Sequence, residues 1–180
     1  MAHNKSKAKG TAYEQKIATR LTSEFGKEFR RVPLSGAIDY LKGDIWTPHD
    51  TAWWPYCIEC KHYKEIQWNN LLTSKTTNIF GFWEQAVREA EVMKKKPLLL
   101  FRWDRSKDFA AYDDDTEVED YVEISSFGHK FKISRLDDWI KAVKKADKLP
   151  KYSMLSNCVI VFAVSYATVS TIASSTEDSS

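Results

Sequence analysis

Two acidic residues and one lysine occupy positions from which they could act together on a phosphodiester. Asp44 is followed fifteen residues later by Glu59, within the segment Ile58-Glu59-Cys60-Lys61. Side chains alternate between the two faces of a strand, so Glu59 and Lys61 would point one way and Ile58 and Cys60 the other. Only an extended backbone gives this grouping, which places Glu59 and Lys61 beside Asp44 on a neighbouring strand.

These residue types suit the hydrolysis of a phosphodiester bond. The reaction needs an oriented water molecule, neutralisation of the charge that builds up at phosphorus, and help for the leaving oxygen. Magnesium prefers oxygen ligands, keeps several waters, and is typically held by one or two carboxylates and the substrate's phosphate. Asp44 and Glu59 are the candidate carboxylates. Lys61 would position the attacking water, help to deprotonate it, or offset charge at the phosphate.

A helix is predicted before these segments. Apolar residues recur at helical spacing from Tyr13 to Phe25, and Gly26 marks the predicted end of the helix. Glu14 lies beside this apolar stripe, at the border between core and solvent, where it could face an active site. It could equally cap its own helix, because Thr11 and Glu14 have the spacing of a capping box.

Three short strands are predicted around the acidic residues, over residues 29–32, 44–46 and 56–61. A loop with turn residues follows the first strand, and the other two suit a hairpin. Asp44 could instead be a turn residue, with Asp39 as the ligand in its place. Asp44 is preferred because a strand continues directly after it.

The rest of the pattern predicts a crossover. A second helix over residues 80–96, closed by Pro97, precedes a fully apolar strand over residues 98–101. A helix followed by a buried strand implies a parallel pair inside a mixed sheet. Further predicted elements are strands over residues 121–124 and 130–133 and a last helix with a capping box of Ser134 and Asp137. We therefore expect an α/β domain in which helices flank a central mixed β-sheet.

With these elements in place, Asp44 and the Glu59-Cys60-Lys61 segment resemble the signature of the PD-(D/E)XK nucleases, with Gly43 where the family often has proline. An acid followed by Glu-x-Lys also occurs by chance, so the flanking elements matter. The segments 9–14 and 31–36, and the order of helix, strand, Asp, Glu-x-Lys, helix and strand, are similar to archaeal-type Holliday junction resolvases and related phage nucleases. The resemblance implies a restriction-endonuclease-like fold.

What the resemblance implies for function is a Mg²⁺-dependent DNA endonuclease, in which Mn²⁺ substitutes for Mg²⁺, acting as a homodimer on branched DNA such as Holliday junctions. Asp44, Glu59 and the backbone carbonyl of Cys60 would bind the metal, and Lys61 would be the catalytic lysine. Three alternatives stay open. One is a nuclease of the same fold that restricts or nicks ordinary duplex DNA, and another is a catalytically inactive nucleic-acid-binding protein. The third is a structural or interaction protein, which would bind DNA weakly and without dependence on salt.

Three further residues match the family with less specific signals. Glu14 would match the acid of the family's first helix. Ser35 would match a serine near the active site in the resolvases, although a serine before Gly36 is more often an ordinary loop residue. Gln85 would match a glutamine sometimes found on the helix after the Glu-x-Lys strand.

Charge is distributed unevenly along a chain whose net charge is only +2. Residues 1–110 carry 19 Lys and Arg against 13 Asp and Glu, and this part contains the motif. Such a surface fits a polyanionic partner, although ordinary solvated charge gives the same count. The residues expected to track DNA phosphates are Lys9, Arg30, Arg31, Ser35, Lys42 and Lys64. Residues 94–96 are all lysine, and we favour a structural role for them at the end of a helix.

Several other patterns are interpreted as structural. Cys57 and Cys60 form a C-x-x-C beside His62, but residues three apart on a strand face opposite ways and cannot easily grip one zinc ion. Three cysteines argue against a disulfide framework and fit a reducing compartment, so a cytoplasmic protein is expected. The similarity to phage nucleases implies a phage-encoded protein that acts in the host cytoplasm. Trp53 and Trp54 could stack on bases, but hairpin packing is the commoner use.

The expected domain organisation has four parts. Residues 1–10 read as a flexible basic arm without the apolar run of a secretory signal, and residues 11–150 as the nuclease domain. Residues 151–173 contain an uncharged stretch that is diluted by polar residues and rich in β-branched ones, so a strand or hairpin is expected there and a membrane span is not. Residues 174–180 read as a disordered tail.

Overall fold

The computed structural model describes residues 2–32, 41–49, 51–72 and 77–146. Its helices are α1 (Ala2–Phe25), α2 (Trp68–Leu72), α3 (Asn78–Met93) and α4 (Leu136–Lys145). Its strands are β1 (Arg30–Arg31), β2 (Ile45–Trp46), β3 (Tyr56–Tyr63), β4 (Lys96–Trp103), β5 (Phe109–Tyr112), β6 (Tyr121–Ser126) and β7 (His129–Arg135). Residues 151–180, for which an extension and a tail are expected, lie outside the described part of the chain, as do Ser35 and Asp39.

The strands form one mixed sheet in the order β1-β2-β3-β4-β5-β7-β6. Strands β3 and β4 pair in parallel, joined by the crossover that contains α3, and the other neighbours pair antiparallel. Both strands are buried at the centre of the sheet, where Leu98 to Phe101 of β4 are fully enclosed. The predicted α/β domain with a central mixed sheet is therefore confirmed.

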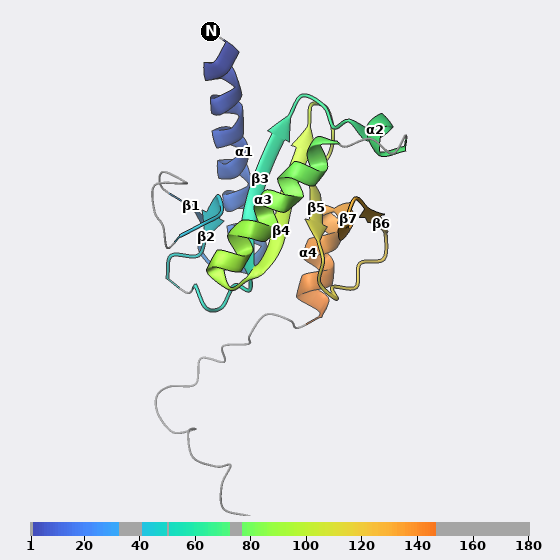
Figure 1. The fold of residues 1–180 in the computed structure, drawn as a ribbon. Coiled ribbons are helices and arrows are strands. Elements are labelled where there is room, and N and C mark those ends of the chain that lie inside the picture. The colour runs from blue at the N-terminus through green and yellow to red at the C-terminus, as the bar shows by residue number, and fades with distance from the viewer. Residues whose placement is uncertain (1, 33–40, 50, 73–76, 147–180) are drawn as a thin grey trace, which may run out of the picture. The chain divides into compact units, whose positions relative to one another are not determined.

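Helices cover both faces of this sheet. On one face α1 and α4 pack against Ile58 and Cys60 of β3 and against Leu98 and Leu100 of β4. On the other face α3 packs against Leu99 and neighbouring residues. Figure 1 shows α3 crossing one side of the sheet, with α1 and α4 on the other side. The alternation predicted for β3 is thus confirmed, because its apolar residues meet α1 and α4 while Glu59 lies on the side of α3.

Helix α1 ends where the sequence predicts but begins earlier. Gly26 follows it with a φ of +65°, a left-handed conformation that glycine adopts without strain. The helix includes residues 2–10, so a flexible arm over this segment is not what the structure shows. Alanine and lysine are strong helix formers. In addition, the Lys9 ammonium is paired with Asp104, which ties this end of the helix to the domain.

The β2–β3 hairpin is confirmed, and so is the packing role of its tryptophans. Trp53 and Trp54 lie in the connection between the two strands and are 5% and 1% exposed. The Trp54 ring makes edge contacts with Phe29 and Tyr56 at centroid distances of 4.8 and 5.4 Å. Neither tryptophan is available for stacking on bases, so the hairpin loop serves as part of the core between α1, α4 and the sheet.

Three local predictions are corrected. Strand β5 was not expected, because its sequence Phe-Ala-Ala-Tyr is short and alanine has little preference for strands. Helix α4 is capped by Arg135 without a side-chain bond, because Ser134 still belongs to β7. Helix α3 ends at Met93 because Lys94 adopts a left-handed φ of 52°, and Pro97 lies inside β4.

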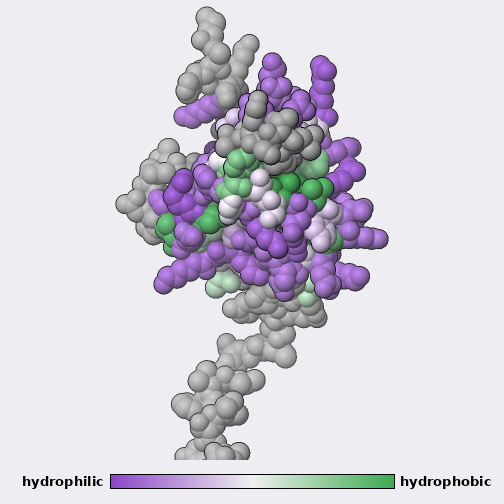
Figure 2. Space-filling model, turned by 45° about the vertical axis from the view of Figure 1, so that its right-hand side comes forward, coloured by the Kyte–Doolittle hydropathy of each residue, from purple (hydrophilic) through white to green (hydrophobic). Residues whose placement is uncertain are grey.

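The lysines after α3 have structural contacts. The Lys95 ammonium donates to the carbonyl oxygens of Thr51 and Trp54 at 2.7 and 2.8 Å, and Lys96 pairs with Asp114 at 3.2 Å. The structural interpretation of residues 94–96 therefore fits the geometry for these two lysines. The face drawn in Figure 2 is covered mostly by hydrophilic residues with smaller apolar areas. Across the described segments, we find no helix long and apolar enough to cross a membrane.

Candidate active site

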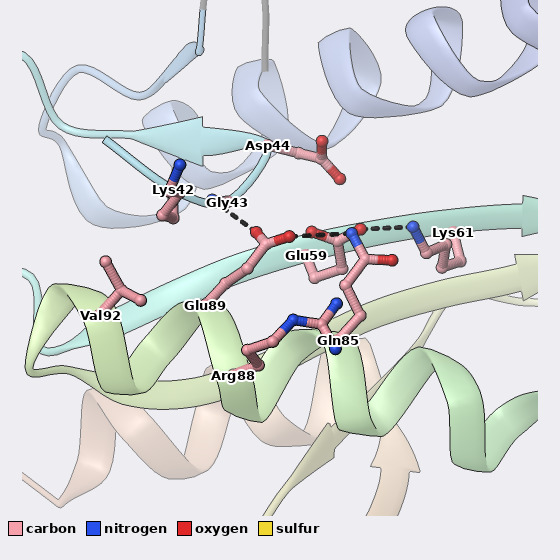
Figure 3. A pocket seen from close by; sticks show the side chains of 9 residues that line it. All are labelled: Lys42, Gly43, Asp44, Glu59, Lys61, Gln85, Arg88, Glu89 and Val92. Carbon is pink, nitrogen blue, oxygen red and sulfur yellow. Dashed lines mark hydrogen bonds and ion pairs between the residues drawn. The ribbon is translucent and has the colours of Figure 1, made fainter. Parts of the chain in front are cut away.

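Asp44, Glu59 and Lys61 line one cleft. It has a volume of about 490 Å³ and opens between the start of β2, strand β3 and helix α3. Its lining is Lys42, Gly43, Asp44, Glu59, Lys61, Gln85, Arg88, Glu89 and Val92. Figure 3 shows the Asp44 carboxylate above β3, which carries Glu59 and Lys61, with one oxygen turned toward that strand and the side chains of α3 rising from below. The three residues singled out in the sequence are therefore brought together on the same side of the sheet.

Asp44 is fixed to β3 by both its backbone and its side chain. Its N–H donates to the Ile58 carbonyl at 2.7 Å, and its Oδ2 accepts from the Cys60 N–H at 2.8 Å. On the other side, the Val32 N–H donates to the Asp44 carbonyl at 2.9 Å. These three bonds connect Asp44 to the segments on both sides of it. Asp44 is therefore held as part of the sheet and is not a free turn residue.

Glu59 and Lys61 form a pair at the floor of the cleft. They share one face of β3, as their spacing predicts, and the Lys61 ammonium donates to Glu59 Oε1. The Glu59 side chain is only 3% exposed and that of Lys61 is 19% exposed. An ionised carboxylate that is so deeply buried lowers the stability of the fold unless a positive charge is paired with it. The Glu-x-Lys spacing supplies that charge, because it places the Lys61 ammonium beside Glu59.

Burial and nearby negative charges perturb the pKa values of both carboxylates. Burial raises the pKa of Glu59 to about 8, with the negative charge of Asp44 adding to the rise. Burial also raises the pKa of Asp44 to about 6, with Glu14 contributing, although the Cys60 N–H opposes the change. Burial lowers the pKa of Lys61, but the Glu59 carboxylate outweighs it, so that pKa lies above its usual value. Lys61 is thus a cation at neutral pH.

The donor set suits a hard divalent cation. Two carboxylates that are buried close together retain their protons to a higher pH than exposed carboxylates do. A divalent cation would replace these protons and stabilise the ionised carboxylates. Within the described residues, no three His, Cys, Asp or Glu side chains come together as a metal-binding group. Asp44 and Glu59 would hold the ion, and the backbone carbonyl of Cys60 is the further ligand that the family resemblance implies. Water and phosphate would complete the coordination, as magnesium prefers. The bound ion would polarise the phosphate and activate water.

The perturbed carboxylates predict that Asp44→Asn stabilises the metal-free protein. The pKa of Asp44 is higher in the folded chain than its ordinary 3.8, so folding binds protons and stability falls as pH rises through about 4 to 6. Asparagine keeps an oxygen for the Cys60 N–H without the charge. We expect a gain of about 1–2 kcal/mol at pH 8 and none at pH 3.5, measured by urea unfolding in EDTA.

The matched control for this measurement is Asp120→Asn, because Asp120 is exposed and distant from the acidic pair in the sequence. That substitution should leave the free energy of unfolding unchanged at both pH values. Destabilisation by Asp44→Asn at pH 8 would show that Asp44 is held as a favourable structural carboxylate rather than a repelled one.

Glu14 does not cap its own helix, and its charge acts on Asp44. Because α1 begins at Ala2, Glu14 lies in the helix interior, which removes the capping-box interpretation. Its Oε2 accepts from Arg31 Nε at 2.6 Å, and its negative charge contributes to the raised pKa of Asp44. Glu14 is therefore close enough to the acidic pair to influence it electrostatically, with Arg31 as its direct partner.

The residues expected to contact DNA occupy different environments. Arg31 is bonded to Glu14, Arg30 pairs with Glu28 at 2.6 Å, and Lys9 pairs with Asp104. Lys64 is exposed just beyond β3, and Lys42 lines the cleft. The contacts of these residues with phosphate remain predictions. The position of Lys42 supports its contact best, because Lys42 lines the same cleft as Asp44 and Glu59.

Helix α3 contributes residues that the sequence analysis missed. Arg88 and Glu89 line the cleft together with Gln85, whose Nε2 donates to Glu89 Oε1 at 2.9 Å. Gln85 was singled out by its resemblance to the family, but Arg88 and Glu89 were not. Residues 85, 88 and 89 are spaced so that they share one side of a helix, next to its apolar stripe. This periodicity is the signal in the sequence from which Arg88 and Glu89 could have been predicted to accompany Gln85.

Cys57 and Cys60 do not form a zinc or redox site. Cys57 and Cys60 are free and buried, and Cys60 lies in the core under α1 while Cys57 lies near Gly43. Burial raises the pKa of Cys57 to about 12, and burial also raises that of Cys60. Thiols held protonated are poor metal ligands and poor nucleophiles, so the Cys-x-x-Cys spacing has no chemical role here.

A mixed sheet that presents two acids and a lysine in one cleft is the arrangement expected of the PD-(D/E)XK class, and the match to a family model supports that class. Residues 5–155 match the family described as "Phage putative PDDEXK endonuclease". The chain therefore belongs to this family of phage endonucleases, hydrolases that act on DNA.

Two similar proteins accompany this match. Protein D14 of Escherichia phage T5 is 35% identical over 120 residues, which cover 64% of this chain and 75% of D14. Among solved structures, Hjc from Archaeoglobus fulgidus, a Holliday junction resolvase from an archaeal hyperthermophile, aligns with a TM-score of 0.43 and 17% identity. That alignment covers 74% of this chain and 98% of Hjc.

Proposed function

We propose that this protein is a Mg²⁺-dependent DNA endonuclease in which Asp44, Glu59 and Lys61 form the catalytic centre. The observation that carries the proposal is the placement of Asp44 and Glu59 in one cleft, each with a raised pKa, beside the Lys61 ammonium. Two carboxylates and one cation are the side chains that in-line displacement at a phosphodiester requires. Mn²⁺ should replace Mg²⁺, because both ions accept oxygen ligands in an octahedral arrangement.

Each residue has a distinct part in this proposal. Asp44 and Glu59 hold the metal, together with the carbonyl of Cys60. Lys61, which is cationic at neutral pH, offsets charge on the phosphate and orients the attacking water once the metal has engaged its partner Glu59. Glu14 acts from the border of the site, where its bond to Arg31 holds both side chains near Asp44.

We further propose that the preferred substrate is branched DNA and that the active form is a homodimer. The support is the resemblance of the segments 9–14 and 31–36 to the junction resolvases, together with the Glu14–Arg31 pair that the fold forms from these two segments. A dimer would present two such clefts to the two strands that a symmetric junction exposes. Phosphate contacts by lysines and arginines would position DNA by its shape and not by its sequence.

One cleavage assay tests both the activity and the choice of substrate. The protein is incubated with a four-way junction, a flap, a single strand and a linear duplex of matched sequence, in Mg²⁺ and in EDTA. We expect Mg²⁺-dependent cleavage with the junction cut fastest. Cleavage of linear duplex at equal rate would favour the restriction or nicking alternative. Junction binding without cleavage in Mg²⁺ or Mn²⁺ would favour the inactive DNA-binding alternative.

Arg88 is predicted to bind a phosphate next to the catalytic centre. It is exposed, lines the cleft, and has no hydrogen bond or ion pair with another described residue, so its guanidinium is available for a phosphate. Arg88→Ala should raise KM and reduce by about one the slope of log affinity against log salt concentration, with a smaller change in kcat. Fluorescence anisotropy of labelled DNA in Ca²⁺ measures the salt slope.

The control for Arg88 is Lys145→Ala, which removes an equal charge from α4 on the opposite face of the sheet. Its salt slope should match the wild type. Equal slopes for the Arg88 variant and the wild type would show that this guanidinium does not contact the DNA backbone.

A further inference from the structure

Glu89 connects helix α3 to the turn that carries Asp44. Its Oε2 accepts a hydrogen bond from the Gly43 N–H at 2.8 Å, and its Oε1 accepts from Gln85 Nε2 at 2.9 Å. Figure 3 draws both bonds, with the Glu89 side chain rising from α3 to reach Gly43. Both carboxylate oxygens are thus engaged, and the direction of the side chain is set from its own helix by Gln85.

The backbone of Gly43 has a conformation that only glycine adopts without strain. Its φ is +86°, and a Cβ at this position would lie 2.8 Å from the Ile58 carbonyl oxygen and 3.1 Å from Cys57 Sγ. Proline cannot stand here, because its ring fixes φ near −65° and removes the N–H. The replacement of the family's frequent proline by Gly43 therefore has a structural consequence: it supplies the N–H that Glu89 binds.

The turn at Gly43 is held from two sides. Asp44, the next residue, is bonded to β3 through its N–H and its Oδ2, at 2.7 and 2.8 Å. Glu89 adds a bond from α3, an element that also lines the cleft. Gly43 directly precedes Asp44 in the chain. A shift of the turn would therefore move the Asp44 backbone, and with it the Asp44 carboxylate, relative to Glu59.

We infer that Glu89 is a positioning residue for Asp44, acting through the Gly43 N–H to hold the Asp44 carboxylate at the distance from Glu59 that a shared divalent ion needs. This inference rests on the proposed nuclease function. Hydrogen-bond partners outside the ligands themselves commonly change metal affinity or activity by about 10–100-fold when they are removed. We expect a loss of this size when Glu89 is removed, because Glu89 bonds the backbone N–H next to the proposed ligand Asp44.

A competing account would give Glu89 only an electrostatic part. Its negative charge contributes to the raised pKa of both Asp44 and Glu59, so it could simply add attraction for a cation. Two substitutions separate these accounts. Glu89→Gln removes the charge but keeps an oxygen for the Gly43 N–H, and its amide can donate to Gln85 once that side chain turns over. Glu89→Ala removes both the charge and the acceptor.

The experiment measures Mn²⁺ affinity by titration calorimetry, kcat and KM for cleavage of a four-way junction, and hydrogen exchange of the Gly43 amide in metal-free protein. For Glu89→Ala we expect Mn²⁺ affinity and kcat to fall about tenfold or more, with KM unchanged and the Gly43 amide exchanging faster. Glu89→Gln should stay within about threefold of the wild type in all four quantities. Glu91→Ala, an exposed neighbour on α3, is the control.

Each remaining outcome decides against the inference. If Glu89→Gln loses as much Mn²⁺ affinity as Glu89→Ala, the charge matters and the bond to Gly43 does not. If Glu89→Ala keeps wild-type Mn²⁺ affinity and kcat but unfolds at lower temperature, the bond is only structural. Failure of the nuclease proposal would look different, because the wild type itself would neither bind Mn²⁺ nor cleave DNA, and the inference would fall with it.

Discussion

Lys61→Ala is expected to lower kcat for DNA cleavage by about 10²–10⁴-fold, the range typical of a group that assists proton transfer or stabilises developing charge. The reason is that the Lys61 ammonium is bonded to Glu59, and its raised pKa keeps it charged at neutral pH. Because Lys61 does not hold the metal in this account, Mn²⁺ affinity should change little. Single-turnover cleavage and calorimetry on the same preparation measure the two quantities.

Lys61→Arg and Lys107→Ala complete that experiment. Arginine preserves the positive charge but not its compact shape, so it should recover part of the lost rate. Lys107 is exposed and lies outside the cleft, so its replacement should leave kcat at the wild-type value. A Lys61→Ala protein that cleaves junctions at more than a third of the wild-type rate would remove Lys61 from the mechanism.

Glu59→Gln is expected to abolish metal-dependent cleavage and to lower Mn²⁺ affinity by more than about 100-fold, since even outer hydrogen-bond partners of metal ligands are worth about 10–100-fold. Glutamine has nearly the same shape and still offers an oxygen to Lys61, so the fold should persist. At pH 8 without metal the variant should be at least as stable as the wild type, because burial and Asp44 oppose ionisation of Glu59.

DNA binding supplies the control for Glu59→Gln. In EDTA, the variant should bind a four-way junction as tightly as the wild type, and more tightly above about pH 8, where Glu59 of the wild type carries a negative charge. Retained Mn²⁺ affinity in a folded Glu59→Gln protein would mean that the metal binds elsewhere.

The metal affinity of the wild type should depend on pH. Asp44 and Glu59 must be ionised to bind a cation, and their pKa values of about 6 and about 8 place this ionisation near neutrality. Mn²⁺ affinity should therefore rise between pH 6 and 8.5, with protons released on binding. Calorimetry in buffers of different ionisation enthalpy counts those protons, and an affinity independent of pH over this range would contradict the assignment.

The alternation of side chains on a strand made the centre of the site predictable. Once the segment around Glu59 is taken as extended, Lys61 must share its face and Ile58 must point to the core, as β3 shows. The crossover into an apolar parallel strand followed from a helix and a buried strand in succession. These predictions needed only local periodicity, and the sequence carries that information directly.

What the sequence could not show are contacts made across the fold. The bond between Glu89 and Gly43 joins residues 46 positions apart and depends on the positive φ of Gly43. The family pattern gives no hint of this conformation, because it often has proline at this position. The capping interpretation of Glu14 failed because α1 begins at Ala2, and weak helix formers such as Asn4, Ser6 and Gly10 gave no sign that the helix runs through them. The pairing of Arg31 with Glu14 was likewise hidden, because it requires β1 to lie beside α1.

The most direct test of the central claim is an anomalous difference map from a crystal of the protein soaked in Mn²⁺. We predict one strong peak between the carboxylates of Asp44 and Glu59 and within coordinating distance of the Cys60 carbonyl, and no such peak in Asp44→Asn crystals. A manganese peak that contacts neither carboxylate, or an equal peak in the Asp44→Asn protein, would contradict the account.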